Sequence, residues 1–135
     1  MLRLAHDVHL TMVAHALDDL PCEACGLLAA TPGKDLAEAI YRCRNAAASA
    51  CLYEVHPFDQ LQADRDAESR GLEIVGVYHS HTHTDAYPSP TDVEQAPDPD
   101  WHYVVVSLRD AEPMVRSYRI VDGAVTEEPV ILADR

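Results

Sequence analysis

The sequence predicts a single α/β domain of the α+β type, in which helices flank a curved, mixed β-sheet. Two observations lead to this fold class. Segments with helical spacing of apolar residues alternate with short β-branched or aromatic runs along the chain. The length of 135 residues suits one domain spanning residues 1–135, and the hydrophobic fraction of 47% is ordinary for a globular protein. We therefore expect one layered domain without a linker.

Two long helices are expected, over residues 6–19 and 57–70. In the first, apolar residues recur at helical spacing, as an amphipathic helix requires. These residues are Leu10, Val13, Ala14 and Leu17. In the second, Pro57 suits the first helical position, where its missing N–H costs nothing, and Gly71 provides the C-terminal stop.

Strands are expected where short apolar or β-branched runs stand between turn residues. The expected segments are 25–30, 36–43, 51–55 (a brief extended piece), 73–81, 101–108, 114–121 and 125–132. The first two should form an antiparallel hairpin, and Asp122-Gly123 is a strong two-residue turn between the last two. A short helix is expected to begin at Ser89-Pro90 and to end near Pro97.

Composition limits the classes of partner. The net charge is -13, with 23 acidic against 10 basic residues. Such acidity argues against nucleic-acid phosphates or an anionic membrane as the main partner, and it suits a basic or neutral protein surface. No apolar run approaches the roughly 20 residues of a membrane span, so we expect a cytoplasmic protein. A homodimer is compatible with the sequence, which does not fix the oligomeric state.

Four cysteines in a chain without a secretion signal are expected to be thiols or ligands rather than disulfides. Cys22 and Cys25 have the Cys-x-x-Cys spacing of half a zinc nucleobase deaminase site, but the sequence lacks the upstream His-x-Glu that such a site needs. A redox pair is a second interpretation. The simplest is a core Cys25 beside an incidental Cys22.

A metal site is predicted where the strand over residues 73–81 ends in His79-Ser80-His81. Side chains alternate along a strand, so both imidazoles lie on one face and can converge on one ion. Zinc suits two imidazoles, a carboxylate and a water. The third ligand is open among His83, Asp85 and Asp92. Asp85 would give a 2-His-1-carboxylate iron site, but the all-β barrel usual for that class would not contain the predicted helices.

Two further residues suit catalysis at such a site. Glu23 lies where a helix gives way to a buried strand, a position in which a carboxylate can serve as general base. Ser89 and Asp92 have the spacing of a capping box with Pro90 at the first helical position. Both side chains would then lie on one helix face and point back toward the end of the strand.

Together, Glu23, His79-x-His81, Ser89 and Asp92 resemble the motif of the JAMM (MPN-plus) metalloproteases, in residue type, order and spacing. The resemblance implies a cytidine-deaminase-like MPN fold in which His79, His81 and Asp92 hold Zn²⁺. It also implies that Glu23 takes a proton from the attacking water and returns it to the leaving amine, while Ser89 donates a hydrogen bond to the oxyanion. Cys25 would pack behind the site. The chain departs from many members in having Thr82 after the second histidine.

The resemblance further implies a substrate. Family members hydrolyse the amide bond after the C-terminal Gly-Gly of ubiquitin-like proteins, and this compact chain is similar to bacterial peptidases that release cysteine from a sulfur-carrier protein. The carrier's tail could add as a strand beside residues 51–55, with Tyr53, Tyr87 and His83 lining the groove or simply lying at the surface. The alternative is a non-catalytic, zinc-stabilised module that binds a ubiquitin-like partner.

Overall fold

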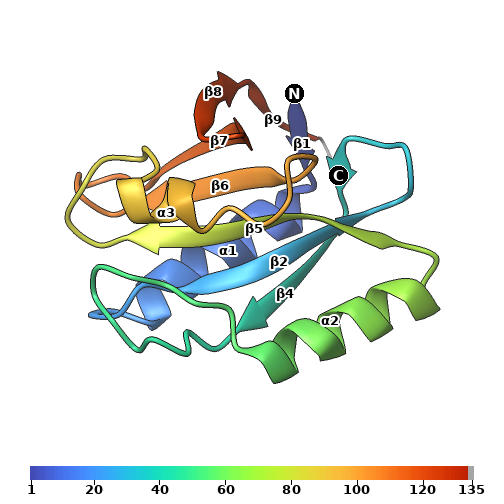
Figure 1. The fold of residues 1–135 in the computed structure, drawn as a ribbon, viewed down its shortest axis with the longest axis horizontal. Coiled ribbons are helices and arrows are strands. Elements are labelled where there is room, and N and C mark those ends of the chain that lie inside the picture. Colours follow the sequence, from blue (N-terminus) through green and yellow to red (C-terminus); the bar gives the residue numbers. More distant parts are fainter. Residues whose placement is uncertain (134–135) are drawn as a thin grey trace.

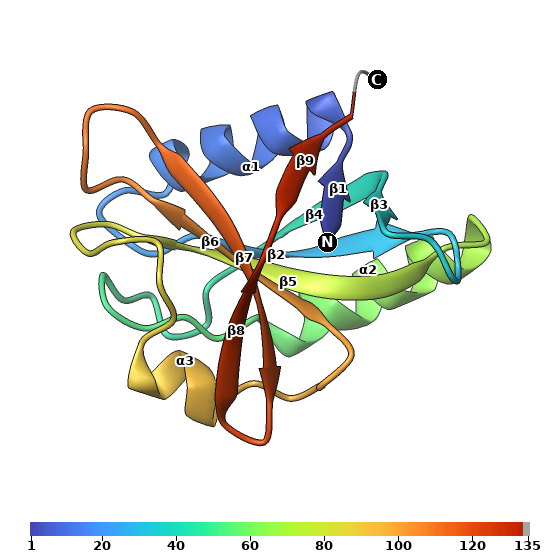
Figure 2. The same cartoon turned by 90° about the horizontal axis from the view of Figure 1, so that it is seen from above.

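A six-stranded mixed sheet forms the centre of the protein, with a long helix on each face (Figures 1 and 2). The computed structural model describes residues 1–133. The strand order is β4 (Ala39–Cys43), β2 (Cys25–Ala30), β5 (Glu73–His81), β6 (His102–Ser107), β7 (Met114–Val121) and β8 (Ala124–Glu128). Strands β5 and β6 run parallel, and the other neighbours run antiparallel. The predicted fold class is confirmed.

A second, small parallel sheet has the order β3 (Leu36–Ala37), β1 (Leu2–Leu4) and β9 (Val130–Leu132). Sequence analysis did not anticipate β1, because three residues at the start of a chain carry no periodic signal. The strand expected over residues 36–43 divides into β3 and β4. The one expected over residues 125–132 divides at Pro129, which cannot donate to a ladder, so β8 pairs with β7 and β9 pairs with β1. Residues 51–55 form no strand, only an isolated bridge between Asn45 and Val55.

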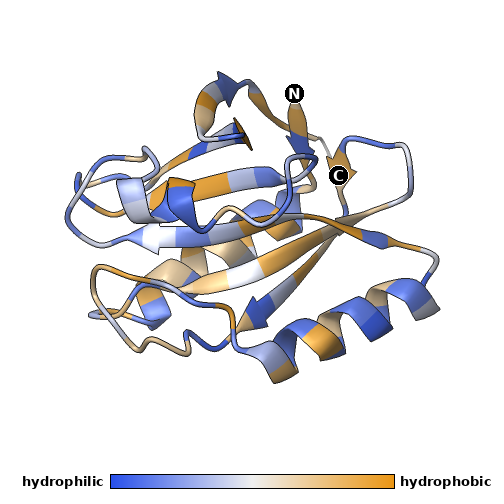
Figure 3. Cartoon of the chain, viewed as in Figure 1, coloured by the Kyte–Doolittle hydropathy of each residue, from blue (hydrophilic) through white to orange (hydrophobic). Residues whose placement is uncertain are grey.

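The two faces of the central sheet bury different helices. Helix α1 (His6–Asp18) packs on the face that carries Tyr78 and Val104, whereas α2 (Pro57–Ser69) packs on the face that carries Val77. Figure 2 shows the helices on opposite sides of the sheet, and α3 (Pro90–Glu94) on the same side as α2. In Figure 3 apolar residues run along the central strands, while α2 is largely hydrophilic, consistent with its burying only two alanines. Because side chains alternate along β5, His79 and His81 share the face of Val77.

Helix α1 is confirmed, but its buried face is not the predicted apolar stripe. Leu10 is 54% exposed and Leu17 is 50% exposed. The buried positions are Val8, Met12, His15 and Ala16. His15 can lie in the core because its Nδ1 is 2.6 Å from the Tyr78 hydroxyl and its Nε2 is 3.1 Å from Asp19. Sequence periodicity cannot anticipate a buried histidine whose partner is distant in the chain.

The predicted hairpin turn and the ends of α2 are confirmed, whereas α3 ends at Glu94, three residues before the predicted end near Pro97. Asp122 and Gly123 both have positive φ, 50° and 80°, as the two-residue hairpin turn between β7 and β8 requires. Helix α2 begins at Pro57, and Gly71 follows it with a φ of 71°. No helix in the described part of the chain combines the length and the apolar character that crossing a membrane requires.

Candidate metal centre

The order of strands brings distant parts of the chain together at the end of β5. Strand β2 runs antiparallel to β5, and Cys25, its first residue, lies opposite His79. The residues just before β2 therefore lie beside the last residues of β5. Two hydrogen bonds fix this junction: the Ala24 N–H donates to Oγ of Ser80 at 2.8 Å, and the Ser80 N–H donates to the Ala24 carbonyl at 3.0 Å. Glu23 is thus held next to His79 and His81, 56 and 58 residues further along the sequence.

Three atoms that can bind a metal ion lie close together at the end of β5. Nε2 of His79 and Nε2 of His81 are 3.2 Å apart, and Oδ2 of Asp92 is 3.0 Å from the first and 3.1 Å from the second. Ligands at about 2.0–2.1 Å from a tetrahedral ion are separated by roughly 3.3 Å. All three residues are buried. The spacing and chemistry of the three atoms therefore fit a divalent metal ion.

Helix α3 brings Asp92 to this site. Ser89 is the N-cap, Pro90 is the first helical residue, and the predicted capping box is present. The Asp92 N–H donates to Oγ of Ser89 at 3.1 Å, and the Ser89 N–H donates to Oδ2 of Asp92 at 2.8 Å. The oxygen that faces both imidazoles is therefore the one fixed by the helix cap. Because Oγ of Ser89 accepts this hydrogen bond, its O–H remains available to donate.

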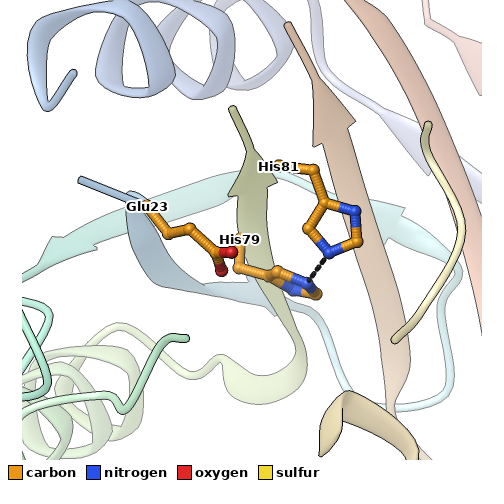
Figure 4. A group of neighbouring side chains, drawn as sticks. All are labelled: Glu23, His79 and His81. Atoms are coloured by element: carbon orange, nitrogen blue, oxygen red, sulfur yellow. Dashed lines mark hydrogen bonds between the residues drawn. The ribbon is translucent and has the colours of Figure 1, made fainter. Parts of the chain in front are cut away.

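Glu23 lies beside the imidazoles without a partner for its carboxylate. Figure 4 shows its side chain directed toward His79, with His81 close by, and the ligand atoms of the three residues lie within 4.8 Å of one another. The residue is only 4% exposed, and within residues 1–133 its Oε1 has no hydrogen-bond partner. Burial, together with the charge of Asp92, raises the pKa of Glu23 to about 7, against the opposing effect of His81. A buried, unpartnered carboxylate indicates that the site accommodates a further group.

The charge states of the other three residues follow from burial and mutual contact. Complete burial lowers the pKa of His79, which favours the neutral imidazole that can bind a metal. Burial also opposes protonation of His81, but hydrogen bonds to Asp92 and to the Asp85 carbonyl outweigh it and raise the pKa of His81. Burial would raise the pKa of Asp92, yet hydrogen bonds from both imidazoles hold that pKa far below its ordinary value. Asp92 is therefore a carboxylate at neutral pH.

Two supporting contacts orient the imidazole rings. The Nδ1–H of His81 donates a hydrogen bond to the Asp85 carbonyl at 2.8 Å, which leaves Nε2 free to face the site. The ring of Tyr53 stacks on that of His79, with centroids 4.2 Å apart and an interplanar angle of 15°. From the sequence, Tyr53 was expected either to line a substrate groove or to lie at the surface. The sequence of a loop does not indicate which residue an aromatic ring in it will contact.

Other candidates lie outside the cluster. The side chains of His83 and Asp85 are exposed, so only the backbone of Asp85 contributes. Tyr87 is 51% exposed and contacts Tyr118, edge to face. Cys25 is fully buried, and burial raises the pKa of its thiol to about 12. That environment disfavours the thiolate of a redox pair and matches the expected packing role behind the site.

Comparison with known families identifies the chain. Residues 5–121 match the model of the prokaryotic homologues of the JAB domain, named Prok-JAB. The chain belongs to this family. The CysO-cysteine peptidase of Mycobacterium tuberculosis is 50% identical over 125 residues, which are 92% of this chain and 86% of the relative. A desampylase of Haloferax volcanii is 35% identical over 111 residues, covering 78% of this chain and 80% of the relative.

Solved structures share the fold of this chain. The solution structure of a Desulfitobacterium hafniense protein has a TM-score of 0.92 and 35% identity, and the match covers 100% of this chain and 94% of that one. A JAB1/MPN domain protein from Archaeoglobus fulgidus, at 18% identity, shares the fold with a TM-score of 0.64 over 98% of this chain and 97% of the other. The predicted family and reaction class, a hydrolytic enzyme of the JAMM type, are confirmed.

Proposed function

We propose that this protein is a zinc peptidase that hydrolyses the amide bond after the C-terminal Gly-Gly of a ubiquitin-like sulfur-carrier protein and releases cysteine. The observation that carries the proposal is the buried, unpartnered carboxylate of Glu23 beside His79, His81 and Asp92. The names of the relatives support the substrate class, since one is a CysO-cysteine peptidase and another a desampylase.

In this proposal His79, His81 and Asp92 hold the ion. Two imidazole nitrogens and one carboxylate oxygen are a donor set that zinc accepts in open, catalytic sites, where one position stays free. When bound, zinc supplies a Lewis acid that polarises the scissile carbonyl and makes nearby water more acidic. The backbone carbonyl of Asp85 and the ring of Tyr53 keep the two imidazoles in place.

Glu23 moves the proton. Its buried carboxylate lies beside the imidazoles, and its Oε1 has no hydrogen-bond partner in the described chain, so it can accept a proton from the attacking water and return it to the leaving amine. The O–H of Ser89 donates to the oxyanion that develops on the carbonyl, a contact typically worth about 3–4 kcal/mol. Water adds to the carbonyl carbon and the C–N bond breaks, which leaves the carrier with a carboxylate and the released cysteine with its amine.

The carrier's tail binds along residues 53–55. The Ala46 N–H donates to the Glu54 carbonyl and the His56 N–H to the Arg44 carbonyl, so the pairing of this segment uses residues 54 and 56. By alternation, the N–H and C=O groups of Tyr53 and Val55 point the other way, and neither residue has a backbone hydrogen bond within the described chain. These groups can pair with an extended peptide by strand addition.

The space beside this edge suits such a peptide. A mainly apolar cavity of about 180 Å³ is lined by residues 53–55 and also by Pro97 and Trp101. Val77, two residues before His79 on the same face of β5, also lines it. A tail lying here would lead toward the two imidazoles. The absence of side chains on a Gly-Gly end allows the close approach that a buried site demands.

Cleavage of a defined adduct tests the proposal. The purified protein with one equivalent of zinc is incubated with a β-grasp carrier ending in Gly-Gly-Cys, and mass spectrometry follows the loss of cysteine. Glu23→Gln should lower kcat at least about a thousandfold, as expected when the proton-transfer group is removed, and should still bind zinc. Glu73→Gln, an exposed glutamate at the other end of β5, should act as wild type.

Two results would contradict the proposal. An adduct that stays intact with the zinc-loaded protein would rule out the peptidase assignment. Full activity of Glu23→Gln would rule out the role of Glu23, and unchanged carrier binding without any turnover in either protein would favour the binding module instead. A cytoplasmic location, a homodimer and the lack of nucleic-acid and membrane partners stay predictions from the composition.

A further inference from the structure

Asn45 lies in the loop that follows β4, and every hydrogen-bonding position of its side-chain amide is occupied. Nδ2 donates to the carbonyls of Glu23 at 3.0 Å and of Leu52 at 2.9 Å. Oδ1 accepts from the N–H groups of Ala47 and Glu54, each at 3.0 Å. An asparagine amide offers two donors and two acceptor lone pairs, so all four are occupied. Asn45 therefore joins three chain segments by hydrogen bonds from one side chain.

One of these segments carries the candidate base. Glu23 lies outside any strand, so no sheet ladder fixes its backbone. Its N–H donates to the Ser49 carbonyl at 2.8 Å and its C=O accepts from Asn45. Both backbone groups of Glu23 thus contact the loop over residues 45–49. Because the carboxylate itself has no partner in the described chain, these contacts determine where the side chain begins.

The other contacts of Asn45 hold the segment that orients His79. Leu52 and Glu54 flank Tyr53 in the sequence, and the amide of Asn45 bonds to the backbone of both. The ring of Tyr53 lies between them and stacks on His79. A single side chain therefore spans from the base on one side of the site to the aromatic support of an imidazole on the other.

We propose that Asn45 is a positioning residue, whose amide sets the distance between Glu23 and the Tyr53–His79 pair. The inference rests on the proposed function. Within the described chain Asn45 has no hydrogen bond to His79 or His81, so it acts through Glu23 and Tyr53. Aspartate at this position would keep the acceptors for Ala47 and Glu54 but would lose both donors, and its charge would repel the Glu23 carbonyl. Asn45→Ala therefore removes all four hydrogen bonds, whereas Asn45→Asp keeps the two within the loop and removes those to Glu23 and Leu52. Comparing the two variants distinguishes the effect of the loop turn from that of the contact with Glu23.

Turnover of the carrier adduct gives the first measurement. Asn45→Ala and Asn45→Asp should each lower kcat between about tenfold and a hundredfold, because small displacements of a catalytic group cost about that much. Because Asn45 also holds Leu52 and Glu54 in the segment proposed to bind the carrier's tail, KM should rise as well, but by less than kcat falls, and zinc stoichiometry should stay at the wild-type value. In a Glu23→Gln background, Asn45→Ala should lower kcat little further, because both substitutions impair the same step, proton transfer by Glu23.

Asp59→Asn is the matched control. Asp59 accepts three hydrogen bonds from Arg44, the neighbour of Asn45, so its substitution loosens the same loop without touching Glu23. It should lower the unfolding temperature and leave kcat unchanged. Amide hydrogen exchange gives a second measurement that needs no activity: the Glu23 N–H should exchange at least tenfold faster in both Asn45 variants, with the Val77 N–H in β5 as reference.

The outcomes separate the two proposals. Wild-type kcat in Asn45→Asp, or an equal loss of kcat in Asp59→Asn, would overturn the positioning role. Unchanged exchange at Glu23 would overturn it as well, whatever the activity. An active Glu23→Gln would instead contradict the proposed function, and exchange at Glu23 would still report on Asn45. If Asn45→Ala does not fold, Asn45→Asp decides, because it keeps the two hydrogen bonds within the loop.

Discussion

The protein contains two buried clusters that pair histidine with a carboxylate, and they differ in whether the buried glutamate of each cluster has an ion-pair partner. One is the candidate metal centre at the end of β5. The other lies at the start of β6, where Oε2 of Glu128 accepts from Nδ1 of His102 at 2.7 Å and from Oγ of Ser117 at 2.8 Å. Oε1 of Glu128 pairs with the N-terminal ammonium at 2.9 Å. This second cluster joins β6, β7, β8 and the N-terminus.

The difference shows what marks a functional site. Oε1 of Glu128, like Oε1 of Glu23, has no hydrogen bond among the described residues, but it lies 2.9 Å from the N-terminal ammonium, so the charge of Glu128 is balanced within the fold. At the metal centre both imidazoles lie within hydrogen-bonding distance of the same oxygen of Asp92. Among the described residues, Oε1 of Glu23 has neither a hydrogen bond nor an ion pair. Buried polar groups are normally paired. A cluster of the same residue types that leaves a carboxylate unpaired therefore indicates a place for an ion and a water.

The largest expected effect concerns metal affinity. Asp92→Asn replaces a charged ligand by an amide and should weaken zinc binding at least about a thousandfold, since loss of an orienting partner alone costs 10–100-fold. Competition with a chromophoric chelator measures this affinity. Glu128→Gln should bind zinc as wild type does. Equal affinity in Asp92→Asn and wild type would place the ion elsewhere and remove the distinction between the clusters.

The next effect concerns stability. Glu128→Gln removes the ion pairs of Glu128 with His102 and the N-terminal ammonium and should lower the free energy of unfolding by about 3 kcal/mol, the usual cost of removing one partner of a buried ion pair. Urea unfolding measures it, and kcat should be unaffected. A loss below about 0.5 kcal/mol would mean that the cluster contributes no more than an exposed ion pair.

The difference in unfolding free energy between wild type and Glu128→Gln should decrease as the pH falls. Burial alone would raise the pKa of Glu128, but hydrogen bonds from His102, the N-terminal amine and Ser117 lower it from 4.5 to about 2. A carboxyl with a lowered folded-state pKa stabilises the fold fully above its ordinary pKa, and the contribution disappears as pH falls to the lower value. Wild type should therefore lose its advantage over Glu128→Gln between about pH 4.5 and pH 2.

Most residues of the candidate site could be predicted from the sequence because they belong to short sequence motifs. The alternation of His79 and His81 along a strand and the capping box of Ser89 and Asp92 each require only a few consecutive residues, and the structure brings all four into the expected arrangement. Glu23 is distant in sequence, and only its place before a predicted buried strand indicated it; the pairing of β2 with β5, which brings it to the histidines, was not predicted. The roles of these five residues stay predictions until they are tested by substitution.

What the sequence could not indicate depends on long-range contacts. Asn45 lies in a loop whose composition predicts only a turn, and its bond to Glu23 spans 22 residues. His15 interrupts the apolar pattern of α1, and only its contact with Tyr78, 63 residues away, makes it a core residue. In each case one side chain is satisfied by a partner that no local pattern specifies, so the sequence predicts the elements better than their buried faces.

The smallest expected effect tests how the two clusters orient their histidines. His102 is oriented by a carboxylate, whereas His79 has the ring of Tyr53 against its face. Tyr53→Ala should weaken zinc binding about tenfold, because a stacked aromatic pair is worth about 0.5–1.5 kcal/mol and its loss also admits water to the imidazole. Tyr53→Phe keeps the stack and should stay within about twofold of wild type. A tenfold loss in Tyr53→Phe would show that the hydroxyl matters, and that His79, like His102, depends on a polar partner.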